Sequence, residues 1–411
     1  MKNIILILII PLFAFPQETL LRWNGELRIR TEADGRDFNL KTAANLYTLS
    51  RIRLGAEIQP VQNVSITVIM QDSRRFGEEP TTTTNNKNLD LYEGYAKIDS
   101  FLFPQLSIKA GRFAISSGSD RILGTLNWNN VGRAFDGLLL HYQRGEALVD
   151  LFAVNISDVN TVPDPVNLSN TTFKRDEGTM MIGGYYIEPF GKELIVNAYA
   201  LQERNKNITT LGAGNFIRST AGFHLKGTLE ELLYETDAAY QFGSANGRTI
   251  SAWMAALSIG QHLTGSPFTS VSMNTDIISG TDPSSFDMNT FVPPYAAGHK
   301  FYGAMDYFIN FPVQTFNRGI MDFYLRGTVI PIDQAVTTVS LHHFVTQKKL
   351  SANENIQDFG QELDILTQFK YNRSVSFDWG LSAFIPGKLM RGSFFANDVS
   401  YWSYLSAQVT F

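Results

Sequence analysis

Two basic segments near the amino terminus carry the residues best suited to binding a charged solute. Arginines alternate with aliphatic residues in residues 26–30 (Glu-Leu-Arg-Ile-Arg) and again in residues 51–54 (Arg-Ile-Arg-Leu). Successive side chains of a β-strand point to opposite faces, so Arg28, Arg30, Arg51 and Arg53 are predicted to share one face. A guanidinium group stays charged and binds carboxylates through paired hydrogen bonds. The spacing therefore predicts a basic ladder for an anionic solute.

A structural role for these arginines is an equally good interpretation. Acidic side chains on the same predicted face could neutralise the guanidinium groups in a network, and they are Glu26, Glu57, Glu93, Asp322, Glu362 and Asp364. The two interpretations stay open at this point.

The end of the chain indicates which kind of strand positions these residues. Residues 401–411 alternate apolar with small or polar side chains and end on Phe411, as closing strands of outer-membrane barrels do. A lipid-facing and a lumen-facing side alternate along a membrane strand. Arg toward lipid at mid-bilayer costs about 2 to 4 kcal/mol, so the ladder is predicted to face the lumen. Aromatic residues at strand ends, Trp379, Tyr401 and Trp402, are predicted to lie in the membrane girdles.

The beginning of the chain agrees with export from the cytoplasm. Lys2 precedes a short apolar run, and the chain turns polar at Gln17, which predicts a signal peptide at residues 1–16. The chain contains no cysteine, so it can cross an oxidising periplasm without mispaired disulfides. The formal net charge of -5 argues against nucleic acid as a partner, because nucleic-acid binding requires a basic surface.

Short and long connections between the predicted strands alternate along the rest of the chain. Short ones are predicted at residues 59–62, 101–104, 143–146, 189–191, 227–229, 331–333 and 371–373, and long ones at residues 73–88, 115–132, 157–177, 203–214, 347–358 and 386–399. Barrels of this kind have short periplasmic turns and long outer loops. Residues 280–316 are ambiguous, and we interpret them as a loop that folds into the lumen, because both chain ends then lie in the periplasm. The prediction is an all-β fold, one transmembrane antiparallel β-barrel of about 18 strands over residues 17–411.

A second group of basic residues lies in a dense motif at residues 109–112, 118–124 and 127–137. It contains Lys109, Arg112, Arg121 and Arg133. Arg133 is predicted to start a strand whose lumenal face continues through Gly137 and His141, and it is the strongest single candidate. Arg112 shares its parity with lipid-facing residues, so it is predicted to snorkel at the rim unless a bulge intervenes. Arg326 completes the set of candidate pore-lining residues.

The motif resembles the alginate export family of outer-membrane porins. Further matches occur at residues 71–74, 298–303, 305–308, 360–364 and 384–387. The resemblance extends over the mature chain and implies an 18-stranded barrel that passes an anionic polysaccharide through an Arg- and Lys-lined constriction. It also implies that no cofactor or energy source is needed. The chain departs from an alginate exporter in its charge, with 39 acidic against 34 basic residues, so a general small-solute porin is an equally compatible interpretation.

An enzymatic barrel has little support in the sequence. The chain has neither a G-x-S-x-G elbow nor an H-E-x-x-H zinc helix. Histidines such as His141, His224 and His299 could meet carboxylates in space, but a lone barrel histidine is more often a hydrogen-bonding lumen residue. The prediction is a non-enzymatic channel in the bacterial outer membrane, without cofactor or metal. Its partners are the membrane lipid, an anionic solute and the barrel assembly machinery, which would bind the strand ending at Phe411.

Overall fold

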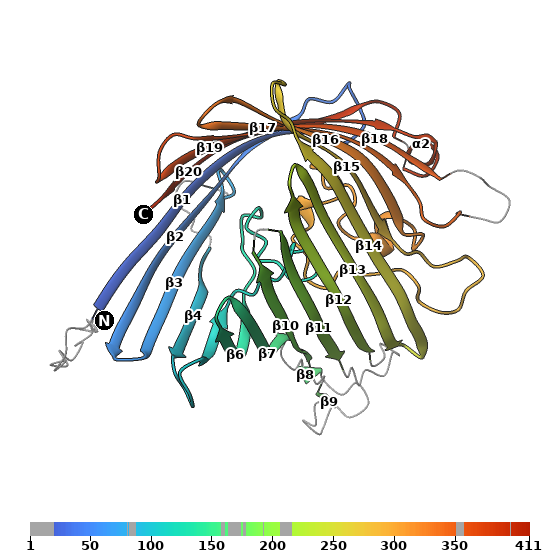
Figure 1. The fold of residues 1–411 in the computed structure, drawn as a ribbon. Helices are drawn as coiled ribbons and strands as arrows, with labels where there is room; N and C mark the ends of the chain where they lie inside the picture. Colours follow the sequence, from blue (N-terminus) through green and yellow to red (C-terminus); the bar gives the residue numbers. More distant parts are fainter. Residues whose placement is uncertain are drawn as a thin grey trace, which may run out of the picture.

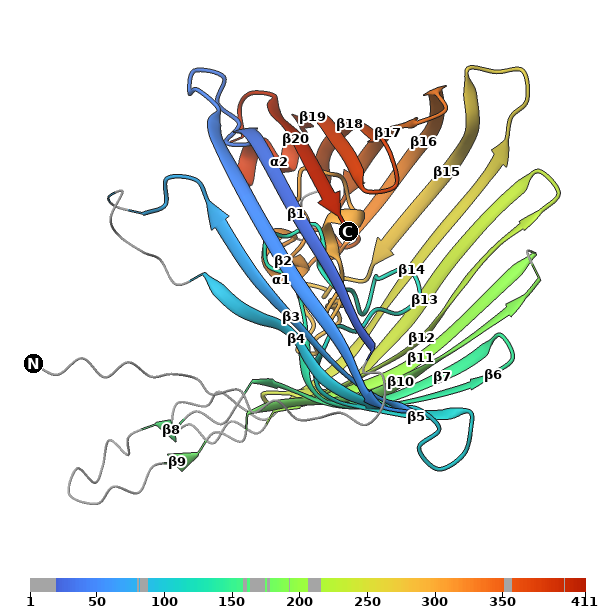
Figure 2. The same ribbon diagram turned by 90° about the vertical axis from the view of Figure 1, so that its left-hand side faces the viewer.

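The computed structural model describes residues 20–79, 81, 88–157, 161–162, 174–175, 178–191, 193–205, 216–350, 357–394 and 396–411. The predicted signal peptide at residues 1–16 lies outside the described residues. Eighteen strands form one antiparallel sheet, and β1 (Leu20–Gly35) pairs with β20 (Ser400–Thr410) to close it into a barrel. The two strands lie side by side in Figures 1 and 2. The predicted all-β, 18-stranded antiparallel barrel is confirmed.

The remaining barrel strands follow in chain order around the ring. They are β2 (Asn45–Val61), β3 (Val64–Arg75), β4 (Leu89–Ile98), β5 (Leu106–Phe113), β6 (Phe135–Arg144), β7 (Ala147–Ser157), β10 (Thr179–Phe190), β11 (Leu194–Asn205), β12 (Phe216–Leu229), β13 (Leu232–Ala245), β14 (Arg248–His262), β15 (Phe268–Ile278), β16 (Ile320–Ile332), β17 (Ala335–Val345), β18 (Asp358–Lys370) and β19 (Val375–Pro386). Short elements outside the barrel wall are β8 (Thr161–Val162), β9 (Lys174–Arg175), η1 (Gly298–Lys300), α1 (Phe311–Gln314) and α2 (Lys388–Ser393). None of the helices in the described parts of the chain has the length and apolar composition needed to cross a membrane.

The side chains alternate between lipid and lumen as the sequence predicts. In β2 the outward Ile52 and Leu54 are each 50% exposed, whereas the inward Arg51 is 2% exposed. Trp379 and Tyr401 also point outward. Trp402 was expected in a girdle and is instead inside the barrel, where its Nε1 donates a hydrogen bond to Glu32 Oε2 at 3.0 Å. It lies one position from Tyr401, so the two rings must occupy opposite faces.

The connections follow the predicted order of short turns and long loops with one exception. β13 and β14 are joined on the loop side by Asn246 and Gly247 alone. Both residues have positive φ, 52° and 73°, the conformation of the two-residue type I′ hairpin turn, for which Asn-Gly is a preferred sequence. Long loops therefore do not alternate strictly with short turns.

Two long loops fold inward and occupy the lumen (Figure 1). We call residues 114–134, between β5 and β6, the first lumenal loop, and residues 279–319, between β15 and β16, the second lumenal loop. The second loop confirms the prediction of a loop at residues 280–316. Around these loops lies a buried apolar cluster that includes Phe308, Phe344, Phe359 and Phe384, each at most 1% exposed. The composition gave no sign of such a core, because its side chains come singly from the lumenal face of many strands and from the loops themselves.

Candidate functional site: two loops across the lumen

The predicted basic ladder holds one end of the first lumenal loop against the wall. Arg28 donates hydrogen bonds to the carbonyl oxygens of Asn127 and Asn129 at 2.6 and 2.8 Å. Arg51 donates to the same two carbonyls at 3.0 and 2.9 Å, and Arg30 donates to the carbonyl of Trp128 at 2.7 Å. Buried carbonyl groups require such donors. Three of the four ladder arginines therefore bind protein backbone.

Two carboxylates complete this anchor. Arg51 Nε lies 2.7 Å from Glu26 Oε1, and Arg30 Nε lies 2.8 Å from Glu32 Oε1. Arg53 differs, because its guanidinium lies 3.7 Å from the centre of the Tyr92 ring and its Nη2 is buried without a hydrogen-bond partner in the described residues.

The other end of the first loop binds the opposite wall. Arg121 is 8% exposed; its Nη2 donates to Asp276 Oδ1 on β15 at 2.9 Å, and its Nε lies 3.4 Å from Asp237 Oδ2 on β13. Burial alone would lower its pKa, but Asp276, Tyr302 and Asp237 outweigh burial and raise the pKa of Arg121 above its ordinary value. β2 and β13 are nine steps apart in the ring of 18 strands, so the loop runs across the full lumen.

The two lumenal loops are joined to each other near the centre. The backbone N–H of Gly124 donates to the carbonyl of Tyr295 at 2.9 Å, and that of Tyr295 donates to the carbonyl of Ile122 at 3.0 Å. Arg133 reinforces this junction by donating to the carbonyls of Gly124, Tyr295 and Ala296. Burial lowers the pKa of Arg133 to about 10. Arg133 was expected to start a strand, but β6 begins at Phe135, because Arg133 binds the loops rather than a neighbouring strand.

The second lumenal loop binds the wall beyond the junction. The backbone N–H of Met305 donates to Glu362 Oε1 at 2.8 Å and that of Ala304 donates to Asp364 Oδ2 at 3.3 Å. Glu362 and Asp364 were predicted to face inward and could have neutralised the arginines. They instead hold this loop over the apolar cluster that fills the sector between β17 and β19.

Among the described residues, one cavity lies on each side of the loop junction. The larger has a volume of about 480 Å³ and includes Arg36 and Tyr47, at the loop ends of β1 and β2, in its lining. We call it the vestibule. The smaller, of about 90 Å³, includes Glu235 and Arg326 and lies toward the short turns. We call it the inner cavity. Arg121 and Phe301 line both and therefore separate them.

The remaining basic candidates take different positions. Lys109 faces the lumen with its Nζ 4.4 Å from the Tyr95 ring centre, and Arg326 donates to Ser340 Oγ at 3.1 Å on the lumenal face. Arg112 lies on the outer face, where it pairs with the exposed Asp136 at 2.7 Å, in agreement with its predicted parity. It is not brought together with the other candidates.

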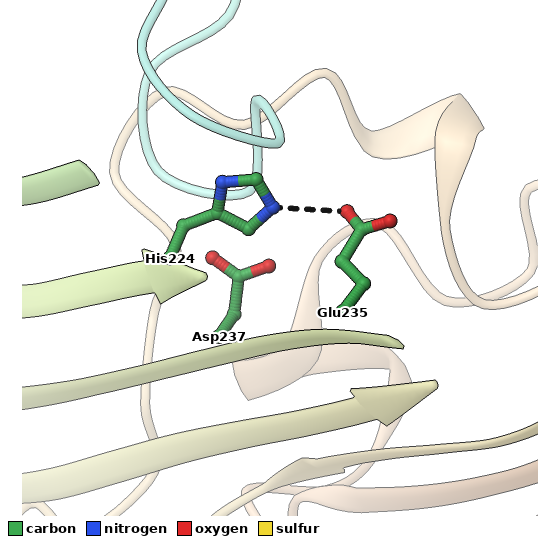
Figure 3. Close-up of side chains that lie close together, drawn as sticks. All are labelled: His224, Glu235 and Asp237. Carbon is green, nitrogen blue, oxygen red and sulfur yellow. Dashed lines mark hydrogen bonds and ion pairs between the residues drawn. The ribbon is translucent and has the colours of Figure 1, made fainter. Parts of the chain in front are cut away.

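One further group was not recognised from the sequence. His224 on β12 lies opposite Asp237 on β13, with Glu235 two residues earlier on the same face (Figure 3). One ligand atom of each lies within 4.8 Å of the others. The hairpin turn at residues 230–231 could have revealed the group. Residues equally far from a hairpin turn lie opposite each other in the two strands, and this holds for His224 and Asp237.

The aromatic lining of the vestibule was also missed. The Trp128 ring stacks on His299 at a centroid distance of 3.9 Å, with the Arg30 guanidinium 3.8 Å from the Trp128 centroid. These residues come from the two loops and from β1, and no local pattern connects them.

Comparisons with known proteins agree with this architecture. The sequence profile described as alginate export matches residues 20–396, and no curated protein matches the chain. Among solved structures, Pseudomonas aeruginosa OpdO is similar with 15% identity and a TM-score of 0.59, over 95% of this chain and 97% of that one. OccK11 (OpdR) of Pseudomonas aeruginosa is similar with 9% identity and a TM-score of 0.58, over 95% and 96%. OpdK of the same organism, solved with vanillate, is similar with 9% identity and a TM-score of 0.58, over 95% and 98%.

Proposed function

The chain belongs to the alginate export family and forms an outer-membrane channel, and we propose that it lets small anionic solutes diffuse passively through the vestibule and past Arg121. The supporting observation is the charge of the vestibule. Its lining contains four arginines, Arg30, Arg36, Arg121 and Arg133, against two carboxylates, Glu32 and Asp306. An excess of positive charge in a low-dielectric concavity concentrates anions.

The route beyond the vestibule supports a small solute rather than a polymer. The first lumenal loop crosses the lumen between opposite walls, and buried aromatic side chains fill the sector beside the second loop. The inner cavity is balanced, with Arg121, Lys300 and Arg326 against Glu235, Asp237 and Asp276. This balance favours a second candidate function, a general small-solute porin without polyuronate selectivity.

The reversal potential of the purified protein in a planar bilayer across a salt gradient tests the proposal. We expect anion preference, and a small aromatic carboxylate such as vanillate is a suitable test solute. Equal permeability of anions and cations would favour the general porin, and cation preference would mean that the lumenal carboxylates dominate. Either result would overturn anion selectivity while leaving the channel itself intact.

Delivery to the membrane is part of the proposal. Residues 1–16 would direct export and be removed, leaving residues 17–411 as the barrel domain. The β20 strand would then be bound by the barrel assembly machinery. Phe411 is 71% exposed, and its backbone N–H and carbonyl pair with Gly25 of β1, so the recognised strand is also the one that closes the barrel.

A further inference from the structure

A cluster of three potential metal ligands lies on the lumenal wall at the far anchor of the first loop. His224 Nε2 lies 3.0 Å from Glu235 Oε1, and the nearest ligand atoms of His224, Glu235 and Asp237 fall within 4.8 Å of one another. The three side chains converge in Figure 3. A single ion could therefore contact all three without a change in the backbone.

The scaffold under the cluster is rigid. β12 and β13 pair without a break from Phe216 to Leu229, and His224 is directly opposite Asp237 in this ladder. His224 and Asp237 are 6% and 3% exposed, whereas the side chain of Glu235 is 36% exposed and faces the inner cavity. The site thus has two buried ligands, His224 and Asp237, that are held in place. The third ligand, Glu235, borders the inner cavity, from which an ion can reach the site.

The donor set selects a class of ion. One imidazole nitrogen and two carboxylate oxygens, with water in the fourth position, form an open tetrahedral zinc site. Mg²⁺ and Ca²⁺ prefer sites made entirely of oxygen ligands. We propose that His224, Glu235 and Asp237 bind a divalent transition-metal ion of the zinc class.

Two basic residues and one hydroxyl already approach the carboxylates. Lys226 Nζ lies 3.6 Å from Glu235 Oε2, and its side chain is 60% exposed, so it can turn into the lumen when an ion binds. Arg121 Nε lies 3.4 Å from Asp237 but makes no hydrogen bond, while its Nη2 is bound to Asp276. Ser119 also hydrogen-bonds Asp237. The lone pairs of Asp237 are therefore only partly occupied, and the positive charges that an ion would meet are the buried Arg121 and the mobile side chain of Lys226.

Isothermal titration of the purified, tag-free barrel with Zn²⁺, and separately with Mg²⁺, tests the site. We expect one Zn²⁺ site per chain, no comparable Mg²⁺ binding, and loss of the Zn²⁺ site in His224→Ala. His141→Ala is the matched control, because His141 is also lumenal and pairs with a single carboxylate, Asp150, at 2.6 Å. It should bind Zn²⁺ like the wild type.

Two further variants keep the test decisive. If His224→Ala does not fold, Glu235→Gln removes the half-exposed ligand with less disturbance and should also lose the site. Lys226→Met removes the competing ammonium group and should bind Zn²⁺ more tightly than the wild type. Zn²⁺ binding that is unchanged in His224→Ala or Glu235→Gln would show an adventitious ion only and would overturn the proposal.

Discussion

At the scale of single residues, burial decides which arginines hold the structure. The Arg51–Glu26 and Arg112–Asp136 pairs have the same N–O distance, 2.7 Å, but Arg51 is 2% exposed and Arg112 is 31% exposed as side chains. Removing one partner of a buried pair leaves an uncompensated charge, whereas an exposed pair contributes little. Arg51 therefore stabilises the loop anchor, and Arg112 does not.

Replacing each arginine by methionine tests this difference. Arg51→Met should lower the free energy of unfolding by about 3 to 5 kcal/mol, because Glu26 is left as a buried charge without its arginine and two loop carbonyls lose one of their two arginine donors. Arg112→Met should change it by less than about 1 kcal/mol. Urea unfolding in the same detergent measures both values. Equal effects would contradict a structural role for the ladder.

At the scale of elements, the first lumenal loop is a bridge fixed at two ends, and Arg121 is its attachment to the far wall. In Arg121→Met the loop should come away from Asp276, so we expect larger and less steady single-channel currents. The loss of a charge near the path should also lower the anion-to-cation permeability ratio by about a factor of thirty, since a unit positive charge 4 Å away stabilises an anion and destabilises a cation by about 1 kcal/mol each in water.

The control for that change is Arg112→Met, which removes an arginine from the outer face and should leave both current and selectivity as in the wild type. Unchanged currents in Arg121→Met would mean that the anchor at Asn127 and Asn129 holds the loop alone.

Features of single strands and loops could be predicted from the sequence, whereas contacts between distant segments could not. Strand periodicity placed Arg28, Arg30 and Arg51 on the lumenal face, and the spacing of turns predicted the loop at residues 280–316. Both depend on neighbours in sequence. The loop carbonyls that those arginines bind, at Asn127, Trp128 and Asn129, lie 76 to 101 positions away, and a backbone carbonyl has no sequence signature. The same limit hid the apolar cluster and the position of Trp402.

At the scale of the whole molecule, the two lumenal loops divide the interior of the 18-stranded barrel. We expect this division to let small solutes pass and to hinder polymers. The sector that contains Phe344, Phe359 and Phe384 is filled by buried side chains, and the vestibule and inner cavity share only Arg121 and Phe301 among their described lining residues. A monomeric uronate has to pass that contact once, whereas a chain of uronates has to occupy it continuously.

We therefore expect liposomes that contain the wild-type barrel to take up a monomeric uronate and to exclude longer uronate oligomers. Replacing residues 118–130 with a short glycine-serine linker removes the bridge, while β1 to β20 retain their pairing, so this variant should admit both solutes. Liposome swelling measures the uptake, and Arg112→Met serves as a control with an intact bridge. If the wild-type barrel passed oligomers as fast as monomers, the bridge would have to open during transport. The channel would then suit the anionic polysaccharide that the family resemblance implies.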